Sequence, residues 1–447
     1  MRTHTFRSIP IALVSIAIAL QSTSWGGGLP SATPEEVGLS ETRLARITAA
    51  MKDDVENGEL RGALAMVARN GKVAYFETAG MADTENNVPM REDTIFRIYS
   101  MSKPITSVAV MTLFEEGRFF LNDPVSKYLP ELAEMNVIVE DPPEASSGVF
   151  NLPDDDPGER STTSTTLADV TTVPAEREMT VQDLLRHTAG FTYGFFGNSE
   201  VDQIYTQMGI LTTEKTIAET VEKLSKIPLK HQPGKTWEYS VSVDVLGRFI
   251  EVIADQRFDE FLQDRIFGPL GMVDTGFYVP DEKLDRFAQL YTPAPEGNGV
   301  VPAPQFFSRN FVNNPTHHSG GGGMVSTASD YLRFCQMLLN GGELDGVRIL
   351  SRKTVELMTA DHTRDIDIAM RSRGYGFGLG FAVAEDIGRA GVLTSPGEYN
   401  WGGAAGTKFW IDPQEQLIGI YMVQILPHTG LTFGNEFKIL AYQAIAD

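Results

Sequence analysis

The sequence predicts a mixed α/β fold of the α+β kind, in which strands from both ends of the chain form one antiparallel sheet. Strand patterns occur near the N-terminus and again in the C-terminal part, and a helix-rich, loop-rich segment from about residue 121 to 279 lies between them. Helices are expected to flank the sheet, and the middle segment is expected to form an inserted, mainly helical subdomain. Because there is no internal repeat and no long linker, residues 26–447 are predicted to form a single domain.

The first elements are a helix and a hairpin. Ser40 is a suitable N-cap for a helix that ends before Gly58. Its buried face is marked by four apolar residues at helical spacing, Leu44, Ile47, Met51 and Val55. Residues 64–69 and 72–78 flank Asn70-Gly71, the dipeptide most favoured in a tight turn between antiparallel strands, so they are predicted to form a β-hairpin.

The remaining elements follow from the same periodicities. An apolar helix is expected from about residue 100 to 117. Further helices are expected at residues 217–224, 243–254 and 433–445. Further strands are expected at residues 377–384, 408–411 and 417–423. The last two strands flank a turn signal that begins at Asp412-Pro413, so they should pair as neighbours.

Composition excludes several classes of protein. The formal net charge is −22, and a field of that sign repels phosphate backbones and anionic membranes, which argues against nucleic acid as a partner. Cys335 is the only cysteine, so an intrachain disulfide and a cysteine metal cluster are both impossible. No metal ion or organic cofactor is expected, and the sequence leaves the oligomeric state open.

The N-terminal residues are predicted to be an export signal. Arg2 and Arg7 precede an apolar run at residues 9–20, and polar residues follow. The run is too short to span a bilayer comfortably, which favours a removable signal peptide at residues 1–25 over a retained membrane-proximal anchor. The mature protein is therefore expected to be periplasmic or secreted, without a stable membrane span.

A second unusual segment is the acidic insertion at residues 139–176. It contains two polar runs, residues 154–159 and 161–166, and shows little periodicity. One interpretation is a solvated surface loop. The other is a lid over a cleft, because long loops without secondary structure often cover active sites.

The strongest chemical signal is Ser100-Met101-Ser102-Lys103, which lies at the start of the apolar helix. Positions i and i+3 share a helix face, so the Ser100 hydroxyl and the Lys103 amine are expected to touch. A serine hydroxyl is a poor nucleophile until a neighbouring base takes its proton. The helix N-terminus also offers free N–H groups to an oxyanion. The motif therefore indicates a nucleophilic serine.

Two further segments, residues 237–247 and 401–407, follow this motif along the chain. In this order the three segments resemble the serine β-lactamase and penicillin-binding-protein superfamily, and most of all its esterase branch, the family VIII carboxylesterases, which are relatives of the class C β-lactamases. Three framework segments also match, at residues 184–191, 319–328 and 374–380. The resemblance covers nearly the whole mature chain and implies a β-lactamase-like fold with its site in a cleft between the sheet and the helical subdomain.

The resemblance also assigns roles. Ser100 would form an acyl-enzyme, and either Lys103 or Tyr239 would accept its proton. The two would titrate as a coupled pair, which leaves the acceptor open. One oxyanion donor would be the Ser100 N–H, and the second would be the Ala404 N–H, on a strand that begins Trp401-Gly402-Gly403. Small residues suit that strand because a substrate must approach its backbone closely.

Two positions depart from the β-lactamase pattern. Val241 stands where an asparagine is expected, and Trp401-Gly402-Gly403 replaces the Lys-Thr-Gly motif, so the lysine that would anchor a substrate carboxylate is missing. Both changes remove polar anchors and favour small, less polar esters. The sequence therefore predicts a serine carboxylesterase that acts on short-chain esters.

Several alternatives stay open. A β-lactamase, a D-aminopeptidase or an acyltransferase would use the same residues, and a catalytically silent peptide- or cell-wall-binding protein would keep only the fold. A Ser-His-Asp hydrolase is disfavoured because the chain lacks a G-x-S-x-G elbow. His187 is interpreted as a framework residue, and the adjacent His317 and His318 would point to opposite faces of a strand. The aromatic residues Phe191, Tyr193, Phe195 and Phe196 are either core or acyl-pocket lining.

Overall fold

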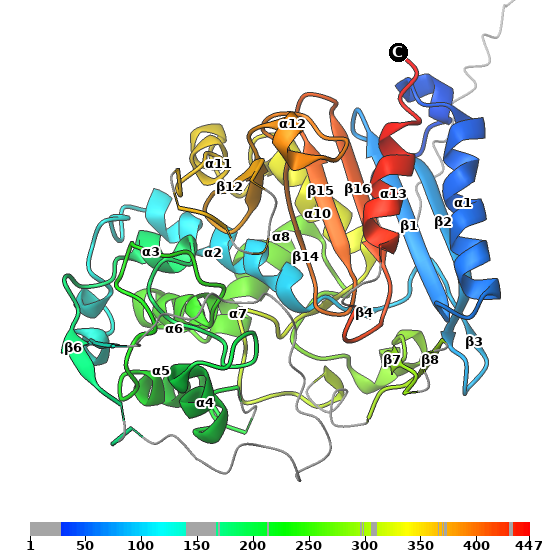
Figure 1. Ribbon diagram of the computed structural model, residues 1–447. Coiled ribbons are helices and arrows are strands. Elements are labelled where there is room, and N and C mark those ends of the chain that lie inside the picture. The colour runs from blue at the N-terminus through cyan, green and yellow to red at the C-terminus, as the bar shows by residue number, and fades with distance from the viewer. Residues whose placement is uncertain are drawn as a thin grey trace, which may run out of the picture.

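The computed structural model describes residues 28–139, 167–168, 170–211, 214–295, 297, 299–304, 311–364, 366–368, 370, 373–428 and 432–447 (Figure 1). The predicted signal peptide at residues 1–25 lies outside this part of the chain, and so does most of the acidic insertion. Within the described residues no helix is both long enough and apolar enough to cross a membrane.

One antiparallel sheet of eight strands organises the fold, in the order β12-β13-β14-β15-β16-β1-β2-β3. Its strands are β12 (Tyr375–Phe377), β13 (Ala382–Ala384), β14 (Tyr399–Gly402), β15 (Lys408–Asp412), β16 (Leu417–Met422), β1 (Gly62–Arg69), β2 (Lys72–Asp83) and β3 (Val88–Pro89). β1 pairs with β16 on one side and with β2 on the other, so strands from both chain ends lie side by side (Figure 1). The predicted α+β class is confirmed.

Both faces of the sheet are covered. Helices α1 (Glu41–Glu56) and α13 (Phe433–Tyr442), from opposite ends of the chain, contact each other and cover one face (Figure 1). The other face packs against α10 (Ala328–Leu339). Because successive β1 side chains point to opposite faces, alternate residues join different cores, and all eight residues of β1 are buried. This is why the strand is an almost continuous apolar run rather than an alternating one.

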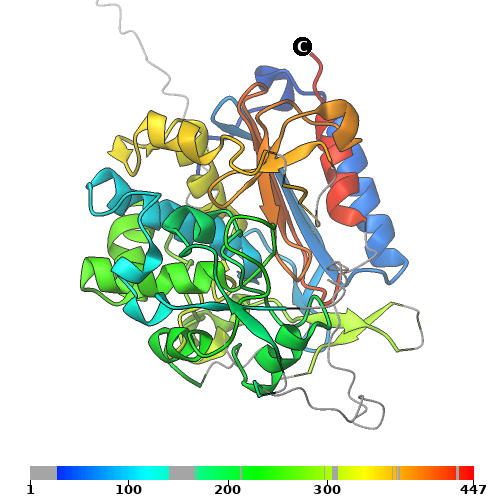
Figure 2. The same ribbon diagram turned by 60° about the vertical axis from the view of Figure 1, so that its left-hand side comes forward.

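A mainly helical region lies beside the sheet (Figure 2). Its helices are α3 (Val181–Leu185), α4 (Glu200–Gln207), α5 (Ile217–Leu224), α6 (Ser242–Ala254), α7 (Phe258–Leu262) and α8 (Gly268–Leu270), with a π-helical turn at Gln263–Phe267. Helix α2 (Ser102–Glu115) packs against α6 and is buried from Ser102 to Leu113. A helix buried on all sides lies in the interior, and α2 therefore carries its N-terminal end to the junction of the two regions.

The remaining elements are short. Two more helices are α11 (Arg352–Met358) and α12 (Ile387–Ala390). Four two-stranded sheets pair β4 (Phe96–Arg97) with β9 (Val325–Ser326), β5 (Asn136–Ile138) with β6 (Thr172–Pro174), β7 (Tyr291–Pro293) with β8 (Val300–Pro302), and β10 (Glu343–Leu344) with β11 (Val347–Arg348). The β5–β6 pair joins the two ends of the acidic insertion, but the residues on which the lid interpretation rests lie outside the described part.

Two sequence expectations were wrong in detail. The strand predicted at residues 377–384 is a hairpin, because β12 ends at Phe377, β13 begins at Ala382, and Gly380 between them has a φ of 100°, which a strand interior does not allow. Trp401 and Gly402 end β14 rather than begin a strand, and the segment from Gly403 to Thr407 is the turn into β15.

Candidate active site

Ser100 lies on a short 3₁₀ turn, Tyr99–Met101, that runs directly into α2. The helix proper begins at Ser102, two residues later than the sequence suggested, yet the continuous winding still places residue 103 over residue 100. Tyr99, immediately before the serine, has a φ of 41°, in the left-handed region that non-glycine residues rarely adopt. Strain of this kind is found at functional sites, where the surrounding structure holds the residue in place.

Lys103 is the centre of the site. Its side chain is buried, and its Nζ donates to three oxygens: Ser100 Oγ at 3.2 Å, the Tyr193 hydroxyl at 2.8 Å and the Gly321 carbonyl at 2.6 Å. An ammonium has three protons and no lone pair, so this arrangement uses every donor. Lys103 is therefore fixed in orientation beside the serine.

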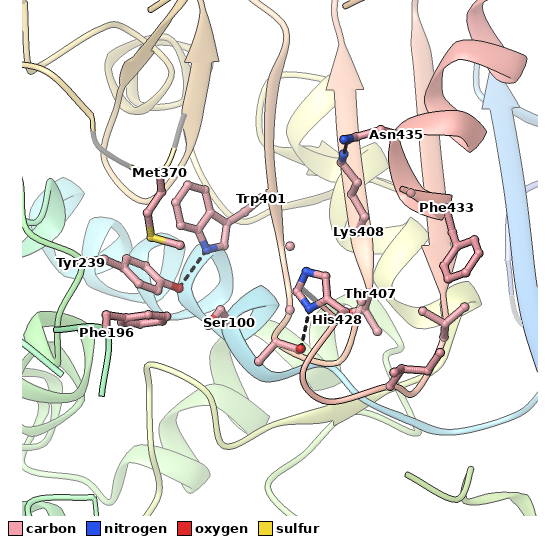
Figure 3. Close-up of a pocket in the computed structure, with 17 residues that line it drawn as sticks. Ser100, Phe196, Tyr239, Met370, Trp401, Thr407, Lys408, His428, Phe433 and Asn435 are labelled. Carbon is pink, nitrogen blue, oxygen red and sulfur yellow. Dashed lines mark hydrogen bonds between the residues drawn. The ribbon is translucent and has the colours of Figure 1, made fainter. Parts of the chain in front are cut away.

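Tyr239 lies beside Lys103, but its hydroxyl is hydrogen-bonded to another residue. Its hydroxyl accepts a hydrogen bond from Trp401 Nε1 at 3.1 Å (Figure 3). The Lys103 Nζ lies 4.5 Å from the centre of its ring. A cation at this distance from a phenol ring is attracted to its π face. Tyr239 thus contacts Lys103 through the face of its ring and Trp401 through its hydroxyl oxygen.

Tyr193 is the residue that the sequence left undecided between core and pocket lining. Burial raises the pKa of its phenol well above the usual value, and the neighbouring charges of Asp244 and Tyr239 act in the same direction. Tyr193 therefore stays a neutral acceptor for Lys103. No motif singled out this contact, because the two residues are 90 positions apart in the chain.

The glycine-rich segment around Gly321 forms the other wall of the lysine site. Asp244 on α6 accepts hydrogen bonds through Oδ1 from Ser319 Oγ at 2.5 Å and from the Gly321 N–H at 3.1 Å, which fixes the carbonyl that faces Lys103. A Cβ at Gly321 would lie 2.6 Å from Asp244 Oδ2 and 2.8 Å from the Tyr193 hydroxyl. Only glycine fits there, and the segment serves the lysine rather than a phosphate.

The turn after β14 supplies the backbone expected to face a substrate. Gly403 N donates to the Thr407 carbonyl at 2.8 Å, and a Cβ at Gly403 would lie 2.4 Å from the carbonyl oxygen of Ile98. The glycine therefore lets this turn approach the chain just before Ser100. The next residue, Ala404, accepts a hydrogen bond through its carbonyl from His428 Nδ1 at 2.7 Å (Figure 3).

His428 was not identified from the sequence. Burial lowers the pKa of its imidazole, the Lys408 ammonium lowers it further, and the hydrogen bond to Ala404 only partly opposes them. A neutral imidazole has one N–H, and the short contact to a carbonyl places that proton on Nδ1. His428 thus holds the turn that contains Ala404.

The serine and the turn after β14 face one open cavity, which holds about 1040 Å³ of empty space including its mouth. Ser100, Tyr239, Trp401, Gly402, Gly403 and Ala404 all contribute to its walls. Phe196 and Met370 lie on the Tyr239 side, and His428, Lys408 and Phe433 lie beyond the turn (Figure 3). The structure thus brings every predicted site residue except Lys103 to the cavity wall, and it places Lys103 directly beneath Ser100. The arrangement can deliver a serine oxygen to a carbonyl held against the turn.

The interpretation of His187 can also be compared with the structure. His187 is buried against the ring of Tyr239, with ring centres 5.0 Å apart, and burial together with Lys103 lowers its pKa well below the usual value. A buried neutral ring packed in this way agrees with a framework role. Among the described residues, no group of three or more His, Cys, Asp or Glu side chains is placed to hold a metal ion.

Fold and site together define a serine hydrolase of the β-lactamase fold. The Beta-lactamase family model matches residues 47–443, and the chain belongs to this family. It is 34% identical over 391 residues to Protein Rv1367c of Mycobacterium tuberculosis, covering 85% of this chain and 89% of that protein.

Two similar proteins carry names that describe an activity. The chain is 30% identical over 388 residues to Esterase EstB of Burkholderia gladioli, covering 82% of this chain and 87% of the esterase. It also resembles the solved structure of EstCE1, described as a hydrolase with promiscuous acyltransferase activity, with a TM-score of 0.72 and 26% identity over 90% of this chain and 99% of that one.

Proposed function

We propose that this protein is a carboxylesterase that hydrolyses short-chain esters through an acyl-enzyme on Ser100. The observation that carries the proposal is the contact between Trp401 and Tyr239. The indole occupies the position where the superfamily pattern has a lysine that binds a substrate carboxylate. Its N–H donates a hydrogen bond to the Tyr239 hydroxyl. Val241 is buried at the start of α6 and offers no polar side chain. Small, weakly polar esters suit such a site better than β-lactams or peptides.

The mechanism follows from the placement of the groups. Tyr239 acts in its phenolate form: as the Ser100 oxygen attacks the ester carbonyl, the Ser100 proton passes to the Tyr239 oxygen and leaves a neutral phenol. The Trp401 N–H donates to the Tyr239 oxygen, and the Nζ of Lys103 is already directed at three acceptor oxygens. The Ser100 N–H and the Ala404 N–H stabilise the oxyanion. Tyr239 then protonates the departing alcohol, and water releases the acid by the same steps in reverse.

The name of one relative supports an ester substrate. EstB is named as an esterase and EstCE1 as a hydrolase, and both align with most of this chain. Within the same fold, β-lactamase, D-aminopeptidase and acyltransferase activities are the alternatives that a substrate panel separates.

The test is a hydrolysis panel of p-nitrophenyl esters from acetate to palmitate, beside nitrocefin and a D-alanyl peptide. The expected result is highest kcat/KM for the short esters and a much lower value for nitrocefin. A nitrocefin value equal to or above that for p-nitrophenyl butyrate would contradict the proposal. A fluorophosphonate probe, read by peptide mass spectrometry, should label Ser100 in the wild type, and Ser100→Ala should lose both labelling and turnover. Ser102→Ala is the matched control and should still be labelled at Ser100.

We also propose that the mature enzyme is exported and acts outside the cytoplasm. The basic and apolar pattern of residues 1–25 supports this. N-terminal sequencing of protein recovered from the periplasm or medium should begin near residue 26, and an intact Met1 on the recovered protein would contradict it.

A further inference from the structure

The cavity continues past the turn that contains Ala404 to a region that the proposed chemistry does not use. We call this region the distal arm. It is lined by Lys408, Val423, Ile425, His428, Phe433, Gly434 and Asn435. Figure 3 shows Lys408 and Asn435 close together, on the side of the turn opposite to Tyr239. The arm therefore lies within reach of a substrate that extends beyond its reacting ester.

The charge of the arm is unusual for this molecule. The chain has a net charge of −22, yet among the described residues that line the cavity none is acidic, and Lys408 is the only lysine or arginine. The Lys408 ammonium donates to Oδ1 of Asn435, which is a neutral amide. The positive charge of Lys408 acts on another lining residue, because it helps to lower the pKa of His428. The distal arm is thus a positive spot in a negative protein.

Local packing directs Lys408 into this place. It is the first residue of β15, and Gly434 lies in the first turn of α13. A Cβ at Gly434 would lie 3.1 Å from Cδ of Lys408, so the bare backbone leaves room for the lysine stem to lie across the helix. The ammonium is thereby placed beside the exposed Asn435.

We propose that the distal arm binds a carboxylate carried by the ester substrate, with Lys408 and the Asn435 amide as its partners. The apolar side chains of Val423, Ile425 and Phe433 would contact the carbon chain that connects this carboxylate to the ester. The natural substrate class is then a half-ester of a dicarboxylic acid, or an ester whose alcohol carries the carboxylate. This inference rests on the proposed esterase activity and names its substrate class. Lys408 would then bind a substrate carboxylate, as the lysine of the superfamily pattern does, but at a different place from Trp401, which occupies that lysine's position.

The test compares charged esters with their methyl-capped partners. Mono-p-nitrophenyl glutarate against its methyl ester probes the acyl side, and para-acetoxybenzoate against methyl para-acetoxybenzoate probes the alcohol side. In the wild type, kcat/KM should be higher for the charged ester in at least one pair, and this preference should weaken as salt is added. The pair that shows the preference identifies which side of the ester enters the arm.

Substitutions at Lys408 complete the test. Lys408→Met should lower the charged-to-capped ratio by about tenfold, the value expected for one charge-assisted hydrogen bond, whereas Lys408→Arg should retain most of it. Lys353→Met, on the exposed face of α11, is the matched control and should keep the wild-type ratio. If Lys408→Met does not fold, Lys408→Gln and the salt dependence of the wild type give the same information.

Equal ratios in wild type and Lys408→Met for both pairs would overturn the distal-arm proposal while leaving the esterase proposal intact. Absence of hydrolysis of the capped esters and of p-nitrophenyl butyrate would instead overturn the esterase activity itself.

Discussion

The Nζ of Lys103 lies closer to the hydroxyl of Tyr193, at 2.8 Å, than to the Oγ of Ser100, at 3.2 Å. The lysine is therefore held by Tyr193, from the loop that follows α3, together with the Gly321 carbonyl at 2.6 Å. Tyr239, the tyrosine of the second motif, is held by Trp401 instead. Two phenols thus serve one lysine in different ways, one through its oxygen and the other through its ring, and their roles can be separated by mutation.

Tyr193→Phe should lower kcat by about 10- to 100-fold, because it removes one of three acceptors from a buried ammonium while keeping the ring. KM should change little, since the hydroxyl lies beneath the cavity and not on its wall. Steady-state kinetics with p-nitrophenyl butyrate checks this. Phe195→Tyr, a neighbouring change of the same size, is the control, and near wild-type kcat in Tyr193→Phe would show that the contact is dispensable.

Tyr239→Phe and Lys103→Ala should each lower kcat by roughly 10²–10⁴, the contribution typical of general acid–base catalysis. The double variant should be little worse than either single one, because both residues manage the same proton and residues that act as a unit are not additive. A double-mutant cycle on kcat/KM measures this directly. Simple multiplication of the two single losses would mean that the residues act independently.

Trp401→Phe should lower kcat several-fold to tenfold, because it keeps an aromatic wall but removes the N–H that donates to Tyr239. The effect should disappear when Tyr239 is already Phe, since the donor then has no oxygen to bind. Comparing Trp401→Phe in the wild-type and Tyr239→Phe backgrounds separates this hydrogen bond from the loss of indole surface. An equal loss in both backgrounds would assign the effect to packing.

Asp183 gives a prediction about stability. Its buried carboxylate accepts hydrogen bonds from Arg177 at 2.6 Å and Arg186 at 2.9 Å. Burial alone would raise the pKa of Asp183, but the hydrogen bonds, of which that from Arg177 is the largest, outweigh it and lower the pKa to about 2.

Because this folded-state pKa is below the unfolded value of about 3.9, the carboxylate stabilises the fold above that pH, by about 2–3 kcal/mol. This contribution is lost as the pH falls from about 4 to about 2. Asp183→Asn should therefore be less stable at neutral pH, and its unfolding free energy should change less over the acid range. Urea unfolding at a series of pH values measures both, and parallel curves for the two proteins would contradict the prediction.

The antiparallel sheet built from both chain ends could be predicted because most of its strands show local periodicity. Short stretches of sequence are enough to predict three elements of the fold: the Asn70-Gly71 turn, the apolar strand β1 and the helix of residues 217–224. The strand predicted at residues 377–384 shows the limit of this method. Alternation continues through a hairpin, and only the pairing of β12 with β13 reveals that the chain turns at Gly380.

The sequence by itself determined the spacing of Ser100 and Lys103, since a helical turn puts residues three apart on one face whatever surrounds them. It also identified the Tyr239 and Trp401 segments by their resemblance to a known pattern. Tertiary structure alone decided what completes the site. Tyr193 and Gly321 lie 90 and 218 residues from Lys103, and no periodicity connects them. His428 meets Ala404, and Lys408 meets Asn435, through contacts between segments that are separated along the chain. Contacts of this kind depend on how buried surfaces fit together, and a linear pattern of residue types does not record that fit.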